Sequence, residues 1–94
     1  MKTMFRGENL CRHLQQTEIK PAAKHQCDKC IALGDTWVHL RACQTCGEVN
    51  CCDNSKNQHA SKHYHETGHP VVISAQPLEH WGWCYEHEIM AKWY

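Results

Sequence analysis

Residues 43–51 read CQTCGEVNC, and this stretch decides the fold. A Cys-x-x-Cys pair comes first, Gly47 follows it, and a short run then leads to a third cysteine, Cys51. Two intervening residues are the loop length that lets two thiolates reach one zinc ion. The stretch therefore predicts a zinc knuckle that leads into a short strand over residues 48–51.

Zinc-type ligands continue on both sides of the knuckle at similarly short spacings. The complete set has twelve members: Cys11, His13, Cys27, Cys30, Cys43, Cys46, Cys51, His59, His63, His69, Cys84 and His87. Zinc in structural sites prefers four nitrogen or sulfur ligands, so twelve ligands correspond to three closed sites. We expect a fold that is specified largely by three Zn²⁺ ions.

The composition limits the size of the core and the classes of partner. A chain of 94 residues with few Leu, Ile, Val and Phe predicts one small domain. Domains of this size are marginally stable from burial alone and often carry metal or disulfide staples. Ten Lys and Arg balance ten Asp and Glu. A nucleic-acid binder usually has a basic face, so no nucleic-acid partner is expected.

The eight cysteines could also form the disulfide scaffold of a secreted protein. However, the first eight residues contain no apolar run typical of a signal peptide, and no apolar stretch approaches the length of a membrane span. A disulfide framework also does not require histidines at short offsets from cysteines. The pattern therefore favours a cytoplasmic protein whose thiols are held by zinc, with no membrane partner.

The expected elements occur in mixed order. Strands are predicted at 37–41, 48–51, 71–74 and 81–85, and residues 15–26 are predicted to be an irregular connection. A polar helix is predicted from Lys56 to about Thr67, with N-cap residues at 53–55 and a stop at Gly68, and a short terminal helix at 86–93. The predicted fold class is α+β, a small zinc-stapled domain with a twisted, mostly antiparallel sheet and one or two short helices.

Spacing alone leaves the division of the ligands open. The two Cys-x-x-Cys pairs could share one zinc, as in a zinc ribbon, although their spacer of twelve residues is short for that pattern. Alternatively, the sets interleave along the chain. His59 and His63 lie four residues apart and would share one helix face, which allows both to bind one zinc or two adjacent ones.

Several motifs occur in an order that is typical of one family. They are Cys11-x-His13, both Cys-x-x-Cys pairs, Trp37, Cys51, His59-x3-His63, Gly68-His69-Pro70-Val71-Val72 and Trp83-Cys84-Tyr85. From residue 11 to about 90 the chain resembles the UBP-type zinc finger, the ubiquitin-binding zinc finger of many deubiquitinases and of a cytoplasmic histone deacetylase. It is most similar to the short stand-alone bacterial members. The resemblance implies an N-terminal extension at 1–10 and a zinc finger domain at 11–94.

The resemblance also implies three interleaved zinc sites. One would be held by Cys27, Cys30, Cys51 and His59, and a second by Cys43, Cys46, His63 and His69. A third site, formed by Cys11, His13, Cys84 and His87, would clamp the two ends of the domain together. Three-zinc relatives usually have Cys at the position of His87, where Glu86 or Glu88 could compete as a ligand.

A peptide-binding slot is a further implication of the resemblance. In relatives that bind ubiquitin, aromatic residues matching Trp37, Trp83 and Tyr85 line a slot for a free Gly-Gly carboxyl terminus. Those relatives carry an Arg and an aromatic residue just after the ligand cysteine, where this chain has Cys-Asp-Asn at 52–54. An acid that faces a carboxylate is repulsive. We therefore expect a protein or peptide C-terminus as the partner, with Asp53 in the slot, but not ubiquitin itself.

The expected function is that of a zinc-binding, non-catalytic interaction module. Catalytic zinc keeps an open position, but twelve ligands fill three sites, and the sequence has no His-Glu-x-x-His, Gly-x-Ser-x-Gly or Gly-rich phosphate loop. The alternatives are a zinc-dependent hydrolase or other enzyme, and a zinc-storage or structural protein without a peptide pocket. Cys52 has no place among the twelve ligands and is expected to be a free, half-buried thiol.

Overall fold

The computed structural model describes residues 3–93, which form a six-stranded antiparallel sheet with three short helices. The strand order across the sheet is β1-β6-β5-β4-β2-β3. The strands are β1 (Phe5–Arg6), β2 (Leu40–Cys43), β3 (Val49–Cys51), β4 (Val71–Ser74), β5 (Trp81–Cys84) and β6 (Ile89–Trp93). The helices are α1 (Arg12–Gln16), α2 (Asp28–Leu33) and α3 (His59–Thr67). The α+β class is confirmed, with three helices where the sequence predicted one or two.

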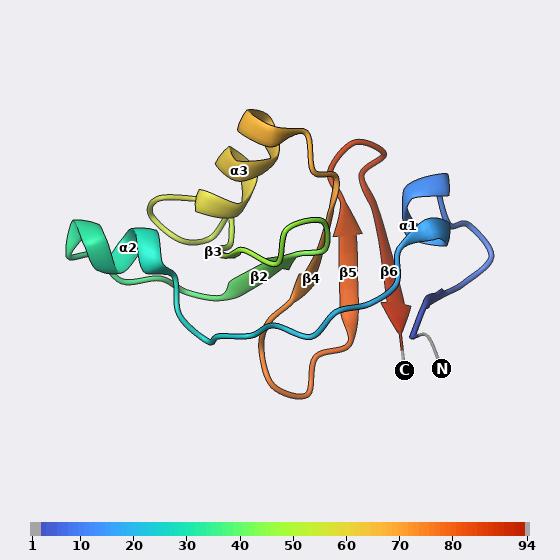
Figure 1. The fold of residues 1–94 in the computed structure, drawn as a ribbon, viewed down its shortest axis with the longest axis horizontal. Helices are drawn as coiled ribbons and strands as arrows, with labels where there is room; N and C mark the ends of the chain where they lie inside the picture. Colours follow the sequence, from blue (N-terminus) through green and yellow to red (C-terminus); the bar gives the residue numbers. More distant parts are fainter. Residues whose placement is uncertain (1–2, 94) are drawn as a thin grey trace.

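The helices are spread along the sheet and do not form a separate layer (Figure 1). Helix α2 lies at one end of the molecule and α1 at the other, beside β6, while α3 lies over the β2–β3 hairpin. Both α1 and α2 begin directly after a predicted zinc ligand, since their N-cap residues are Cys11 and Cys27. Each helix is too short to be stable alone, so its position depends on the tertiary contacts of its first turn.

The core lies on one face of the sheet, and β1 closes it at the edge next to β6. Phe5, within the predicted extension at 1–10, pairs with Trp93 and packs over Gly82 of β5. A Cβ atom built on Gly82 would lie 2.5 Å from the Phe5 ring and 2.7 Å from the carbonyl oxygen of Val72. Glycine at position 82 therefore leaves room for the Phe5 side chain of the edge strand to pack over β5.

The predicted helix at 86–93 is wrong, because these residues form a turn and strand β6. Cys84 pairs with Ile89 and Gly82 with Ala91, so β5 and β6 form a hairpin. The hairpin turn places Glu88 at φ 55°, a left-handed conformation that ends any helix there. Pairing with both β5 and β1 satisfies the backbone hydrogen-bonding groups of β6. A short terminal helix would leave the groups at its two ends without partners.

Helix α3 also starts later than predicted. Its N-cap residue is Gln58, which has left-handed dihedral angles and makes no side-chain cap hydrogen bond. The predicted cap residues at 53–55 are used elsewhere: the Ser55 hydroxyl accepts a hydrogen bond from the Val38 N–H, and Asp53 accepts one from Ser61. The predicted stop at Gly68 is confirmed, since its φ is 77° and its N–H donates to the Tyr64 carbonyl.

Candidate metal centres and binding cavity

Twelve Cys and His side chains gather in three groups of four. Within each group the ligand atoms all lie within 4.8 Å of one another. The groups are Cys27, Cys30, Cys51 and His59 (site 1); Cys43, Cys46, His63 and His69 (site 2); and Cys11, His13, Cys84 and His87 (site 3). The sets interleave along the chain, as the resemblance implied, and the two Cys-x-x-Cys pairs do not share one group as a ribbon would require.

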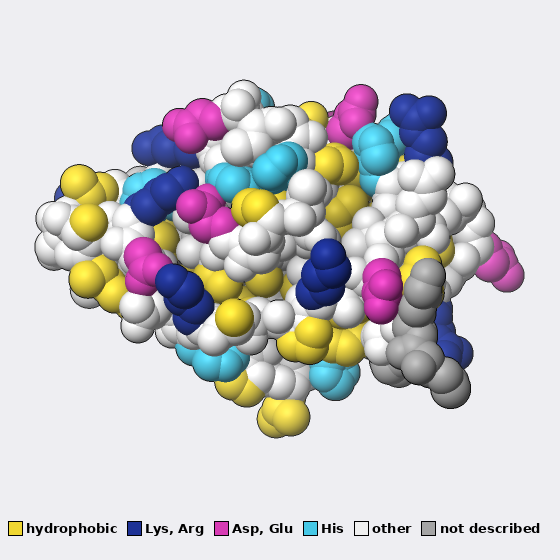
Figure 2. All heavy atoms as spheres, in the orientation of Figure 1, with side chains coloured by type: hydrophobic (Ala, Val, Ile, Leu, Met, Phe, Trp, Pro, Cys, Tyr) yellow, Lys and Arg dark blue, Asp and Glu magenta, His cyan; other side chains and the backbone are white. Residues whose placement is uncertain are grey.

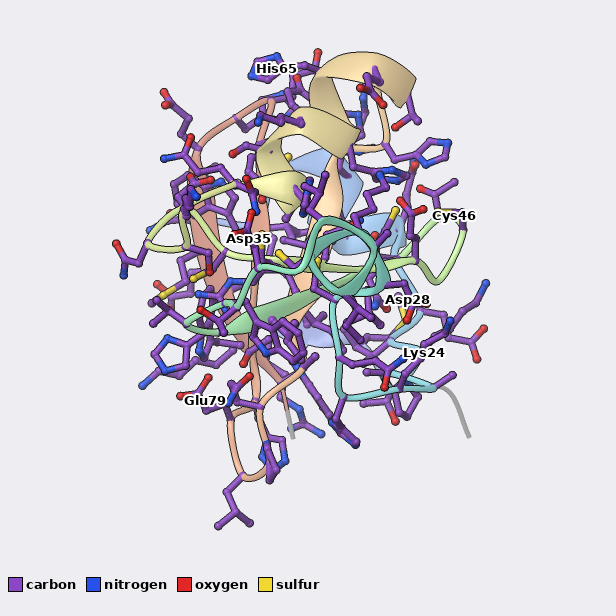
Figure 3. All side chains as sticks on the ribbon, turned by 90° about the vertical axis from the view of Figure 1, so that its left-hand side faces the viewer. Lys24, Asp28, Asp35, Cys46, His65 and Glu79 are labelled. Atoms are coloured by element: carbon purple, nitrogen blue, oxygen red, sulfur yellow. The ribbon has the colours of Figure 1, made fainter. Side chains whose placement is uncertain are left out.

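Helix α3 links sites 1 and 2. His59 and His63 are one turn apart, but His59 points to the thiols of Cys27 and Cys30, whereas His63 points to Cys46. His65 projects from the outer side of the same helix, far from Cys46 (Figure 3). One short helix thus delivers a ligand to each of two neighbouring sites.

Site 3 joins residues that are 71 positions apart in the chain. The Cys84 sulfur lies 3.5 Å from Nδ1 of both His13 and His87. Cys84 ends strand β5, His87 lies in the β5–β6 turn and His13 belongs to α1. A single ion bound here would therefore tie α1 to the β5–β6 hairpin.

The distances within the groups fit tetrahedral zinc. Zn–S bonds of about 2.3 Å and Zn–N bonds of about 2.05 Å place sulfur and nitrogen ligands about 3.5 Å apart, and two nitrogens about 3.4 Å apart. The sulfur-to-nitrogen distances are 3.3–3.5 Å in site 1 and 3.4 and 3.6 Å in site 2. His63 Nε2 and His69 Nδ1 lie 3.4 Å apart. The three groups are therefore consistent with three Zn²⁺ sites.

Burial disfavours the thiolate form of three of the seven ligand cysteines. Burial raises the pKa of Cys30 to about 11, and burial also raises the pKa of Cys43 and of Cys84 above the ordinary value. Without a cation these thiols would stay protonated at pH 7 and would offer weak ligands. A bound zinc ion favours the thiolate over the protonated thiol, because it stabilises the thiolate form directly.

Two carboxylates outside the ligand sets contact ligand histidines. Nδ1 of His63 lies 2.6 Å from the Glu48 carboxylate, and Nε2 of His13 lies 3.4 Å from Glu86. A carboxylate on the second ring nitrogen fixes the ring orientation and raises the basicity of the metal-binding nitrogen. Glu48 also accepts a hydrogen bond from Asn50, which is the first cause that keeps its pKa below the ordinary value. Sequence reasoning missed this role of Glu48.

A cavity of about 200 Å³ lies beside β5, and none of the twelve zinc ligands lines it. Val72, Trp81, Trp83 and Tyr85 form its apolar walls. Arg41 and the segment Cys52-Asp53-Asn54 complete the lining. Of the four predicted slot residues, the structure brings Asp53, Trp83 and Tyr85 together here. Trp37 lies outside the lining and packs against the core instead, and Trp81 takes its place.

The cavity carries charges of both signs. The Arg41 guanidinium carbon lies 4.5 Å from the centre of the Trp81 ring, and Nη1 donates to the carbonyl of its neighbour Leu40. Asp53 accepts a 2.5 Å hydrogen bond from Ser61 of α3. Burial, followed by the Asp53 charge, raises the pKa of Tyr85 to about 12. Tyr85 is therefore a neutral hydroxyl group at physiological pH.

Helix α3 supports this cavity as well as two zinc sites. Tyr64 of α3 stacks on Tyr85, with ring centroids 5.1 Å apart and an angle of 16° between the planes. Ser61 holds Asp53 from the same helix. Because α3 carries His59 and His63, the cavity wall is tied to the metal sites through one element.

Cys52 belongs to none of the three Cys and His groups, and it is buried where the sequence predicted a half-buried thiol. Its sulfur lies 3.6 Å from the Ser55 hydroxyl. Burial disfavours the thiolate, but hydrogen bonds from Ser55 and from the backbone of Asn54 and His39, together with the Arg41 charge, hold the pKa of Cys52 below the ordinary value.

Known proteins share this combination of sequence and fold. The family described as "Zn-finger in ubiquitin-hydrolases and other protein" matches residues 25–92. The chain belongs to this family of UBP-type zinc fingers. The NMR structure of protein RPA1320 from Rhodopseudomonas palustris is 43% identical in sequence to this chain, with a TM-score of 0.80, and the match covers 92% of this chain and 84% of that one.

The curated relatives are much longer than this chain. The chain is 38% identical over 60 residues to "NAD-dependent deacetylase sir2A" of Dictyostelium discoideum, covering 64% of this chain and 10% of the deacetylase. It is 32% identical over 79 residues to "Histone deacetylase 6" of Caenorhabditis elegans, covering 80% of this chain and 8% of that protein. The chain thus spans about a tenth of the length of these relatives.

Acidic and basic side chains are interspersed on the face that Figure 2 shows, with no broad basic patch over that face. Among the described residues, no helix has the length and apolar character that crossing a membrane requires.

Proposed function

We propose that this zinc finger is a non-catalytic module that binds the free carboxyl terminus of a protein partner in the cavity beside β5. The observation that carries this proposal is a guanidinium, Arg41, in a cavity that three aromatic side chains also line. Small concave sites gain affinity from apolar walls and orientation from a few polar groups. A guanidinium can hold a carboxylate through two parallel hydrogen bonds, which a mid-chain peptide cannot offer.

The donor sets argue against catalysis at the metals. Each group supplies four Cys or His ligands, which is the composition of a closed structural site. A catalytic zinc would need three protein ligands and an open position. The deacetylase activities named for the relatives belong to proteins about ten times longer than this chain. Seven zinc-bound thiolates require a reducing compartment, so we place the module in the cytoplasm.

Ubiquitin itself is a poor candidate for the partner. Its Gly-Gly end brings a carboxylate and no side chain, and Asp53 adds an uncompensated negative charge to the cavity. Asp53→Arg should raise the affinity for a Gly-Gly-ending peptide by tenfold or more, because a charge-assisted hydrogen bond contributes about 1.5–3 kcal/mol. No gain in this variant would argue against a carboxylate-binding slot at this position.

The test compares matched peptides that end in a free acid or in an amide. The zinc-loaded protein is titrated with each peptide, and binding is followed by tryptophan fluorescence, since Trp81 and Trp83 line the cavity. The acid should bind at least tenfold more tightly than the amide, and Arg41→Gln should abolish this difference. Equal binding of acid and amide peptides would contradict recognition of a chain end.

A further inference from the structure

The cavity beside β5 holds two opposite charges that do not neutralise each other. Arg41 and Asp53 both line it, yet within residues 3–93 neither forms an ion pair with an oppositely charged side chain. Arg41 is held over Trp81 and bonded to a backbone carbonyl, and Asp53 is held by the Ser61 hydroxyl. Each charge is thus fixed by neutral groups and remains available to a ligand.

We propose that the cavity selects a carboxyl terminus whose last residue is basic, Lys or Arg. The terminal carboxylate would pair with Arg41, and the side-chain cation of the same residue would pair with Asp53. This inference rests on the proposed function, because it uses Arg41 as the carboxylate donor. It goes beyond it by assigning the chemistry of the partner's last side chain.

The chemistry of the lining supports a dipolar ligand over a purely anionic one. A carboxylate alone gains from Arg41 but is repelled by Asp53, whereas a ligand that also carries a cation satisfies both groups. The apolar walls of Trp81, Trp83 and Val72 can cover the methylene stem of a lysine while its charged head reaches Asp53. The negative charge of Asp53 also disfavours a chain end whose last residue is acidic, and this repulsion is a source of specificity.

The zinc-loaded full chain is titrated with four peptides that share the sequence acetyl-Ser-Gly-Ser-Gly before the last residue. Three end as free acids in lysine, in norleucine or in glutamate, and the fourth ends in lysine amide. The lysine acid should bind about threefold to tenfold more tightly than the norleucine acid, because one partly exposed charge pair is added. The glutamate acid should bind more weakly than both, and the lysine preference should shrink at high salt.

Substitutions that remove or reverse the charge at position 53 test whether Asp53 is the group that selects the basic residue. In Asp53→Asn the lysine and norleucine acids should bind equally, and in Asp53→Lys the glutamate acid should become the preferred ligand. Glu8→Lys, which makes the same charge change at an exposed residue outside the cavity, should keep the wild-type order. A zinc content and amide spectrum like those of the wild type verify that each variant is folded.

The possible outcomes separate the two proposals. If the norleucine and lysine acids bind equally well and the amide does not bind, chain-end recognition stands and selection of a basic residue is overturned. If none of the acids binds better than the amide, both proposals are overturned. A lysine preference that survives in Asp53→Asn would also overturn the assignment of Asp53.

Discussion

Replacing Glu48 with glutamine should weaken zinc binding at site 2 without removing any zinc ligand. Glu48 lies 2.6 Å from the second ring nitrogen of His63, and its side chain is 41% exposed. Glutamine keeps an oxygen that can accept from His63 and from Asn50, so ring orientation is largely preserved. The substitution therefore removes the negative charge beside the metal-bound imidazole, together with the 3.4 Å ion pair that Glu48 forms with Lys29.

The expected magnitude follows from that geometry. Hydrogen bonds to charged groups contribute about 1.5–3 kcal/mol and neutral ones about 0.5–1.5 kcal/mol, so the loss is about 1–1.5 kcal/mol. This corresponds to about tenfold in zinc affinity, which is the lower end of the range for residues that support metal ligands. The partial exposure of Glu48 places the effect at that lower end.

Glu86→Gln is the matched control at site 3. Its carboxylate lies 3.4 Å from His13 and is 54% exposed, so the same substitution should change zinc affinity by about twofold or less. Zinc release is followed by titration with a chelator, and mass spectrometry of alkylated thiols identifies the site that opens. Alkylation of Cys43 and Cys46 should begin at about tenfold lower chelator activity in Glu48→Gln. A Glu48→Gln protein that releases zinc like the wild type, or only as readily as Glu86→Gln, would refute the reasoning.

Three further outcomes are expected. Cys46→Ser should abolish folding, because sites 1 and 2 share helix α3, whereas Cys11→Ser should mainly release α1 from the β5–β6 hairpin. Equal loss of amide dispersion in the two variants would contradict this ranking. Gly82→Ala should lower the free energy of unfolding of the zinc-loaded protein by about 1–3 kcal/mol, because the added Cβ would lie 2.5 Å from the Phe5 ring. Denaturant titration measures this change, and an unchanged midpoint would argue against the contact. Zinc binding should release protons and strengthen as pH rises, because the thiols of the metal-free, unfolded chain have ordinary pKa values of about 8.5 and are protonated at pH 7, whereas the ion binds the thiolate. Calorimetry in buffers of different ionisation enthalpy measures the proton count, and zero protons at pH 7 would contradict the thiolate assignment.

The three Cys and His groups could be anticipated because short spacings and family motifs carry local information. A Cys-x-x-Cys pair fixes its two sulfurs near each other whatever the rest of the chain does, and His59 and His63 follow from one helical turn. Interleaving could not be derived from the spacings, since the ribbon arrangement satisfied them nearly as well. The resemblance to the family, not local geometry, separated those two arrangements.

Features that depend on long-range strand pairing could not be predicted from the sequence. Residues 86–93 became a strand because β5 and β1 lie on either side of them, and nothing local to the segment favours that over a short helix. The cap residues at 53–55 satisfied partners elsewhere, such as the Val38 N–H, so the helix began at His59. Arg41 and Trp81 face one cavity because the sheet order places β2 and β5 on either side of β4, which spacing along the chain does not reveal.

Native mass spectrometry of the purified protein, paired with an amide spectrum before and after chelation, tests the central claim most directly. The claim is that three zinc ions specify the fold of a chain whose own core is small. The structure predicts three zinc ions per chain and the collapse of amide dispersion once they are removed, since each structural site contributes on the order of 10 kcal/mol or more, above the net stability of a small domain. Fewer than three ions in the folded protein, or a native spectrum in the metal-free protein at pH 7, would contradict it.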